Sequence, residues 1–439
     1  MSHKPSGLRG FVLVWIGQLF SMVGSQMTHF SMGVWAWEKT GQATPLAMVA
    51  FFSFAPFIVF SPIAGVLVDR WNRKLVMALS DIGAGLMTIV ILVLLVTGNL
   101  EIWHLYLTGA VGGIFGSFQW LAYSAAISLM VPKKHYARTS GMISMAGSGV
   151  GIIAPIMAGF LLPIIELSGI IAIDLATLMI ALVFLLIVLI PEPKEKQLDK
   201  SKGAFSRELI YGFRYLFERP SLLYLQLGFF MTNLFFSVGY TLLTPMVLAS
   251  TRGNATILGS VQSAGAIGGL VGGLVLTAWG GPKKKINGVI FGWIVNGLLG
   301  FGLMGFGRTL PYWLAGHFML MLISPLLNGS SQAIWQAKVA PEVQGRVFSV
   351  RRFIAQVTAP ISMAVAGPLA DRLFEPALSM PRDWLTVFLS SIFGSEPGGG
   401  MALLIVMSGI LISGVGLVAS RIAAIREIET LIPDHKETG

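Results

Sequence analysis

Three side chains that could carry a proton lie inside long apolar segments. They are His29, Asp81 and Asp174. Histidine titrates near neutral pH, and a carboxyl group that is shielded from water can bind and release a proton. The same groups can instead hydrogen-bond between helices or at helix ends. The residue types alone leave the proton role and the structural role open.

Further polar and aromatic side chains recur at helical spacing in the apolar segments, as Asn328 and Gln332 do. A polar group at membrane depth is costly unless it faces the helix bundle or a wet cavity. The pattern therefore predicts a cavity with scattered amides and rings, which suits a bulky amphiphilic molecule. For each residue the alternative is a hydrogen bond between helices. The predicted cavity residues are Gln26, His29, Phe30, Gln119, Trp120, Tyr123, Asn233, Phe236, Tyr240, Asn328, Gln332 and Gln356.

Long apolar segments must position these groups. A stretch of about 20 apolar residues crosses the ~30 Å hydrocarbon layer as a helix, because lipid offers backbone groups no other partner. The composition agrees, with 54% hydrophobic and 11% charged residues and a mean hydropathy of +0.77. We predict an all-α membrane protein with twelve transmembrane helices. These are 10–37, 44–68, 75–97, 102–130, 140–165, 169–190, 220–249, 255–279, 286–306, 311–338, 347–371 and 400–420.

The longest polar stretch divides these helices into two groups of six. Sequence similarities between the groups recur at an offset near 208, such as 65–71 with 273–279. Parallel repeats of this kind are found in alternating-access transporters. We therefore predict two pseudo-symmetric six-helix bundles, joined by a cytoplasmic linker with an amphipathic helix. The expected boundaries are 1–190 for the first bundle, 191–219 for the linker, 220–420 for the second bundle and 421–439 for a cytoplasmic tail.

The basic residues favour one side of the membrane. If both termini are cytoplasmic, that side holds 25 of the 30 Lys and Arg residues, as the positive-inside rule expects. The net charge of +10 then needs no nucleic acid to explain it. We expect a multi-pass protein of the inner (plasma) membrane, whose first apolar stretch is a retained span. The chain has no cysteine, so disulfides and thiolate chemistry are excluded.

The loop after the second predicted helix has a distinctive pattern of glycine, aspartate and basic residues. Gly65 could allow close helix packing, and Asp69 favours the positive end of a helix dipole. The loop resembles one in the major facilitator superfamily, and the resemblance implies that the start of the eleventh helix is this end, with Arg351 and Arg352 nearby. These groups could latch the cytoplasmic side shut; ordinary positive-inside charges are the alternative. Arg70, Arg73 and Lys74 complete the predicted gating motif, and Asn72 is expected to allow a left-handed turn.

This loop resembles the motif G-x-L-x-D-R-x-x-R-K of the major facilitator superfamily. The segments 339–349, 367–376 and 426–435 look like the branch of that family that contains macrolide-efflux proteins and enterobactin exporters. The resemblance implies export of drugs, macrolides or siderophores by alternating access, driven by the proton gradient. An importer of the same fold and a lipid scramblase or flippase remain as alternatives.

A membrane enzyme is a further alternative, but the sequence lacks the motifs it would need. It has no Walker A sequence, no clustered metal-binding signature and no G-x-S-x-G motif. We therefore expect no enzyme activity, no cofactor and no metal. The expected partners are a small amphiphilic substrate, protons and membrane lipids, and we expect a monomer. The external segment 372–399 contains a short apolar stretch, 384–393, which is expected to lie at the membrane surface or to re-enter the membrane.

Overall fold

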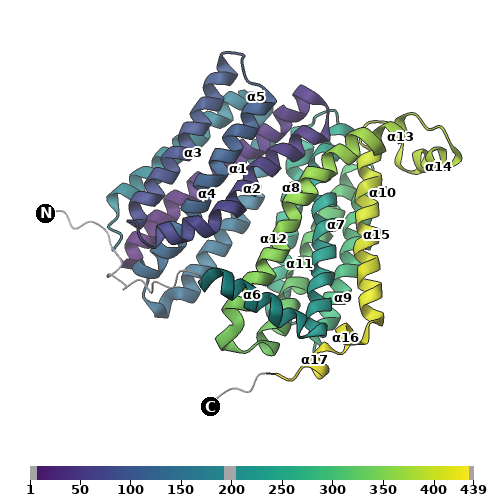
Figure 1. The fold of residues 1–439 in the computed structure, drawn as a ribbon. Coiled ribbons are helices and arrows are strands. Elements are labelled where there is room, and N and C mark those ends of the chain that lie inside the picture. Colours follow the sequence, from purple (N-terminus) through teal and green to yellow (C-terminus); the bar gives the residue numbers. More distant parts are fainter. Residues whose placement is uncertain (1–6, 192–203, 435–439) are drawn as a thin grey trace. The chain divides into compact units, whose positions relative to one another are not determined.

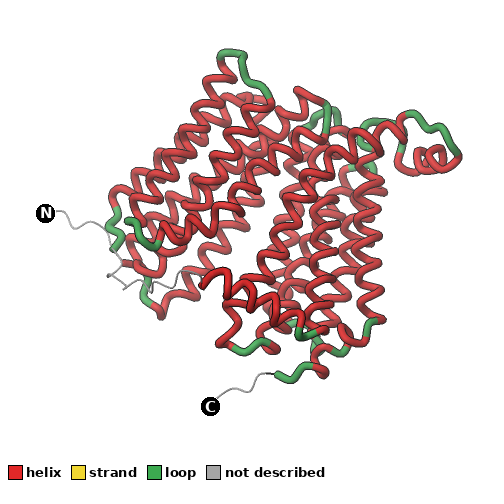
Figure 2. Tube along the Cα trace, in the orientation of Figure 1, coloured by secondary structure: helices red, strands yellow, loops and turns green. Residues whose placement is uncertain are grey.

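The computed structural model describes residues 7–191 and 204–434. Figure 2 shows this part of the chain as helices joined by loops, and no strand occurs in it. Ten of its helices are long and apolar enough to cross a membrane. A chain with this many apolar helices is a multi-pass membrane protein.

The chain forms two compact units. Unit 1 comprises Met1–Gln197 and Thr251–Ser263, and unit 2 comprises Leu198–Ser250 and Ala264–Gly439. The α-helices of unit 1 are labelled in Figure 1, and the last of them, α8, continues into unit 2. The helices are α1 (Gly7–Thr40), α2 (Ala43–Val68), α3 (Arg73–Val96), α4 (Ile102–Met130), η1 (Lys133–His135), α5 (Tyr136–Ile187) and the first turns of α8 (Ala255–Trp279).

Helix α5 covers two of the predicted spans. It has 52 residues, about 78 Å at ~1.5 Å per residue, more than twice the hydrocarbon thickness. The expected break between 165 and 169 is reduced to a kink at Glu166, whose φ of 59° and ψ of 178° are not helical. The chain therefore turns at a single residue. The predicted helix 140–165 lies before this turn and the predicted helix 169–190 lies after it.

Small residues bring the helices of unit 1 into close contact. A side chain at Gly24 of α1 would meet Thr177 and the backbone of Asp174 on α5. A side chain at Gly113 of α4 would meet the backbone of Ser53 on α2. Glycine at such positions lets helix backbones approach closely, which is how helices associate in lipid. Thr256 of α8 adds a hydrogen bond of 2.9 Å to the carbonyl oxygen of Gly159 on α5.

Unit 2 contains the remaining helices. They are α6 (Ala204–Phe217), α7 (Pro220–Ser250), the rest of α8, α9 (Lys285–Val295), the π-helix η2 (Asn296–Phe301), α10 (Gly302–Phe306), α11 (Leu310–Lys338), α12 (Pro341–Leu369), the π-helix η3 (Ala370–Phe374), α13 (Glu375–Ser379), α14 (Trp384–Phe393), α15 (Gly399–Arg421), α16 (Ala423–Arg426) and α17 (Ile428–Leu431).

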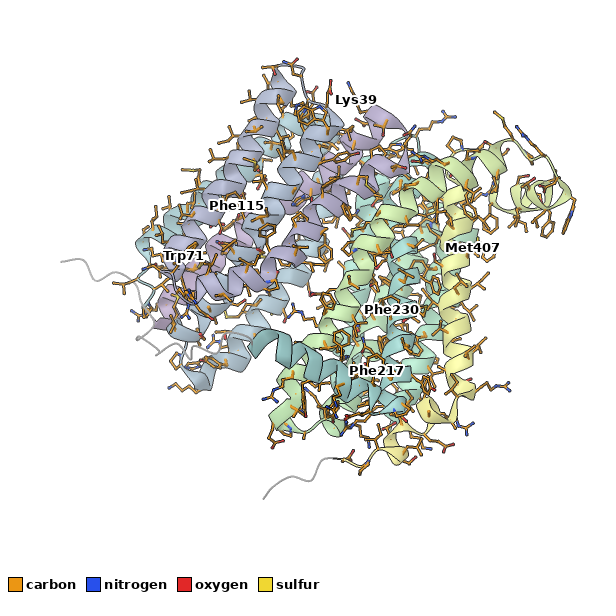
Figure 3. The ribbon with its side chains drawn as sticks, viewed as in Figure 1. Lys39, Trp71, Phe115, Phe217, Phe230 and Met407 are labelled. Atoms are coloured by element: carbon orange, nitrogen blue, oxygen red, sulfur yellow. The ribbon has the colours of Figure 1, made fainter. Side chains whose placement is uncertain are left out.

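The predicted amphipathic helix forms α6, which packs on α12. Leu216 is buried, and Gly212 lies against the side chain of Val350. The guanidinium of Arg346 lies 5.2 Å from the ring centre of Tyr211. Phe217, labelled in Figure 3, follows the buried Leu216 and is itself 67% exposed. The helix therefore keeps an apolar surface that this unit does not cover.

Helix α12 differs from the prediction at both ends. It begins at Pro341, not at 347, and continues through η3 into α13. Arg351 and Arg352 consequently lie about three turns inside the helix, and the prediction that they stand near its start was wrong. The positive end of this helix dipole is at Pro341, away from both arginines.

The short apolar stretch 384–393 forms α14 beside α15 at one end of unit 2 (Figure 1). Asp383 caps it, accepting a hydrogen bond of 2.8 Å from the backbone N–H of Thr386. Hydrogen bonds from Thr386 lower the pKa of Asp383. The guanidinium of Arg308 donates to the carbonyl oxygen of Ile392 at 3.0 Å. These bonds fix both ends of α14, while Trp384 is exposed.

The tail after α15 folds back onto unit 2. The buried ammonium of Lys338, at the end of α11, donates to the carbonyl oxygens of Glu429 and Ile432 at 2.6 and 2.5 Å. It also pairs with Asp434 at 2.8 Å. The carboxylate of Glu429 accepts the backbone N–H groups of Lys285 and Ile286, both at 3.1 Å. Glu429 of the tail thereby caps the start of α9, and Lys338 of α11 satisfies carbonyl groups at the end of α17.

Candidate functional site

The loop between α2 and α3 carries the predicted gating motif. Asp69 ends α2, its side chain is 73% exposed, and a carboxylate oxygen lies 3.8 Å from a guanidinium nitrogen of Arg73. Asn72 has a φ of −63°, so the expected left-handed turn was wrong. Its side chain instead accepts a 3.0 Å hydrogen bond from the N–H of Leu75 and caps α3.

Other motif residues attach this loop to the rest of unit 1. The ammonium of Lys74 donates to the carbonyl oxygens of Leu186 and Val188 at 2.8 and 2.7 Å, which satisfies the C-terminal end of α5. Trp71, labelled in Figure 3, stacks on Phe118 of α4 with 6.5 Å between ring centres. Arg70 is exposed. Within unit 1, Gly65 has no neighbour that a side chain would meet within 4 Å.

The arginines expected opposite this motif belong to unit 2. Arg351 donates to the side chains of Gln332 and Ser331 on α11 at 2.7 and 2.9 Å. Its guanidinium also lies 5.1 Å from the ring centre of Trp335. Arg352 is exposed. Gln332, predicted to line a cavity, is therefore a partner of Arg351.

The carboxyl group of Asp81 is buried between three helices of unit 1. The amide of Gln18 on α1 donates to it at 3.3 Å. The amide of Gln119 on α4 in turn donates to the oxygen of Gln18 at 3.4 Å. Of the predicted cavity residues, Gln119 is thus joined to a predicted proton carrier. Gln18, which bonds to both Asp81 and Gln119, was not among the predicted site residues. The sequence signal for it is its helical spacing from Ser25, seven residues further along α1.

Asp174 occupies a second buried position, between α1 and α5. The hydroxyl of Ser25 donates to its carboxyl group at 3.0 Å. His29 lies one turn further along α1, is exposed and interacts electrostatically with Asp174. The structure thus brings two of the three predicted proton carriers together and places Asp81 apart from them. Phe30, predicted to line the cavity, is buried in unit 1.

A small pocket of about 120 Å³ lies within unit 2. Three predicted cavity residues, Asn233, Phe236 and Asn328, line it together. Asn296 and Trp293 also line it, and the prediction missed both. Both are buried, and among the described residues the side-chain oxygen of Asn296 and the indole N–H of Trp293 have no hydrogen-bond partner. The sequence signal for this side of the pocket is Asn296, a polar residue inside the apolar segment 286–306.

The remaining predicted residues are distributed over both units. The ring of Tyr240 stacks on that of Phe236 with 5.6 Å between centres. Gln26 and Trp120 are exposed on unit 1, and Tyr123 is partly buried there. Gln356 is partly buried in α12. None of these last four residues lines the pocket formed by Asn233, Phe236 and Asn328.

Long apolar helices that bury isolated carboxyl and amide groups are typical of polytopic membrane proteins, in which such groups mark functional positions. The chain belongs to the Major Facilitator Superfamily, whose family model matches residues 14–363. Membership in this family of transporters identifies the protein as a transporter and not as an enzyme.

Relatives with curated names are similar over most of the chain. Macrolide efflux protein A of Streptococcus pyogenes is 29% identical over 378 residues, which cover 83% of this chain and 90% of that protein. Multidrug resistance protein MdtG of Enterobacter lignolyticus is 26% identical over 375 residues, covering 80% and 84%.

Solved structures of transporters share the fold. The inward-facing, unoccupied structure of a bacterial homolog to the human lysosomal transporter Spinster has a TM-score of 0.65, with 16% identity, 94% of this chain and 98% of that chain covered. The nucleoside transporter NupG has a TM-score of 0.63, with 12% identity and coverages of 94% and 99%. At these identities the likeness concerns the fold alone.

Proposed function

We propose that this transporter exports amphiphilic small molecules, such as drugs, macrolides or siderophores, in exchange for protons. The names of its relatives, a macrolide efflux protein and a multidrug resistance protein, support export and this substrate class. Amide and aromatic side chains on α1, α4, α7, α11 and α12 offer the mixed apolar and polar contacts that such molecules need.

The observation that supports proton exchange is the burial of the carboxyl groups of Asp81 and Asp174 without a cationic partner among the described residues. Both are buried in apolar helices and accept hydrogen bonds from uncharged donors, Gln18 and Ser25. Among the described residues neither carboxyl group forms an ion pair with Lys or Arg. A buried carboxyl group without a permanent cation can alternate between its neutral and charged forms as protons and substrate come and go.

Alternating access completes the proposal. We count twelve membrane crossings by taking α5 as two and adding α4 to the ten apolar helices. The basic loops support a cytoplasmic position for both termini, and we propose the inner (plasma) membrane as the location. The two bundles of six, 1–190 and 220–420, rock about a central substrate site, with 191–219 as the linker and 421–439 as the tail. One monomer suffices for this cycle.

In this cycle Asp69 helps to hold the cytoplasmic side closed. Asp69→Asn is expected to reduce efflux several-fold, because the exposed side chain has among the described residues a single ion pair, at 3.8 Å to Arg73, and can form a stronger one when the cytoplasmic side closes. The amount of folded protein should stay near that of the parent, because Asp69 supports little inside unit 1. Efflux from cells, normalised to membrane-embedded protein, measures the effect. The matched control is Asp371→Asn, and full activity of Asp69→Asn would refute the latch.

The proposed function is tested by transport into everted membrane vesicles. Vesicles with the protein should accumulate a labelled macrolide when a proton gradient is imposed, and collapsing the gradient should stop uptake. Uptake that persists without the gradient would rule out proton coupling. A labelled lipid in proteoliposomes tests the scramblase alternative, which requires lipid movement without any gradient.

A further inference from the structure

A pocket of about 790 Å³ lies at one end of unit 1, within the range of drug-sized sites. It is lined by the end of α1, the end of α3, the kink of α5 and the first turns of α8. Figure 3 labels Lys39, the residue after Glu38, at this end. Because α2 returns the chain to the opposite end, the pocket lies at the other end of the unit from Asp69.

The chemistry of this pocket favours a cation. The carboxylates of Glu38 and Glu166 line it, and the described lining residues include no Lys, Arg or His. Among the described residues neither carboxylate has an ion-pair partner. Trp35 supplies a ring whose face attracts cations, and Leu162 adds apolar surface. Two carboxylates without an ion-pair partner attract positive charge to the pocket.

Two further observations point to a ligand. Ser31 is one of the residues around the pocket; its side chain is buried, and its hydroxyl has no hydrogen-bond partner among the described residues. A buried polar group without a partner is costly unless something else satisfies it. Glu166 holds a φ of 59°, which a residue other than glycine rarely adopts. Strained backbone of this kind clusters at binding sites.

We propose that this pocket binds an amphiphilic organic cation at the outer end of unit 1. The proposal rests on the proposed function for the membrane orientation and for the role of the ligand as an exported substrate. The two carboxylates neutralise the charged group, the Trp35 ring packs against it, and the apolar wall covers the rest of the molecule. The pocket is thus a second site, separate from the amide-lined pocket of unit 2, and it selects for positive charge.

The first test is equilibrium binding of labelled tetraphenylphosphonium to the full chain in nanodiscs. The double variant Glu38→Gln and Glu166→Gln should weaken binding about fivefold or more, because two partly exposed ion pairs are lost. Tetraphenylborate, an anion of the same shape, should bind the double variant at least as well as the parent. Glu396→Gln, which removes one exposed carboxylate from unit 2, is the control and should leave binding unchanged. Equal affinity of parent and double variant for tetraphenylphosphonium would overturn the proposal.

The second test reads the local charge directly. The chain has no cysteine, so Ser168→Cys provides a single thiol in the pocket wall. In detergent, a trimethylammonium methanethiosulfonate should label it much faster than a sulfonate one, and the two Gln substitutions should remove this preference. A preference that survives them would refute the cation site. In spheroplasts the same thiol should react from outside; if it reacts only from inside, the proposed orientation fails while the charge preference stands.

Discussion

Asp81→Asn is expected to lower proton-driven efflux to the level of vesicles without the protein. Asparagine keeps the size of the side chain and can still accept the hydrogen bond from Gln18 at 3.3 Å, but it cannot exchange a proton. Substrate exchange without a gradient should persist, since that reaction needs no net proton movement. The measurement compares gradient-driven uptake with counterflow in the same proteoliposomes.

The variants around this experiment separate coupling from folding. Asp174→Asn tests the second carboxyl group in the same way, and Glu342→Gln, at an exposed position of α12, is the matched control. His29→Gln tests whether the neighbour of Asp174 sets the pH dependence of transport. If Asp81→Asn and Asp174→Asn both retain gradient-driven uptake, the carboxyl groups serve only to join helices, and the protons travel elsewhere.

Gly113→Val is expected to destabilise unit 1 severely. The new side chain would collide with the backbone of Ser53, and a backbone carbonyl cannot turn aside as a flexible side chain can. Overpacking of this kind costs about 3 kcal/mol or more when the backbone must move. The expected result is a large loss of folded protein at 37 °C, because helices α2 and α4 can no longer approach each other.

The adjacent glycine provides the control. Gly112 has nothing within 4 Å of the position that a side chain would take, so Gly112→Val should change stability by only about 0.5 kcal/mol. Thermal unfolding followed by size-exclusion chromatography distinguishes the two variants. Equal melting temperatures for Gly112→Val and Gly113→Val would show that α2 and α4 are not held at this contact.

Hydropathy predicted most helices because burial in lipid dictates both their length and their composition. The prediction was less successful where local geometry decides. The sequence predicted an interruption between 165 and 169, but it did not indicate that a single non-helical residue, Glu166, would make it. Helix α12 begins at Pro341, since proline is favoured in the first turn of a helix and the polar residues after it are compatible with one.

The candidate site was predictable as a set of residue types but not as a set of partners. Polar groups in apolar helices mark Asp81 and Asp174, yet their donors Gln18 and Ser25 follow from how α1 packs on α3 and α5. The same packing buries Phe30 while leaving His29 exposed. Asn72 caps α3 because its side chain accepts a hydrogen bond from the N–H of Leu75. The prediction considered only the tolerance of asparagine for left-handed backbone and so missed this role.

The contacts of Lys338 and Glu429 bear on how the protein can be tagged and shortened. A reporter joined after residue 439 leaves both residues in place, so the start of α9 keeps its cap and the ammonium of Lys338 keeps its acceptors. A chain cut before Glu429 would leave the first N–H groups of α9 without their acceptor. It would also remove the acceptors in the tail that bind the buried ammonium of Lys338. Versions of the protein that are trimmed at the C-terminus for crystallisation should therefore stop after Asp434, or they will yield little stable protein.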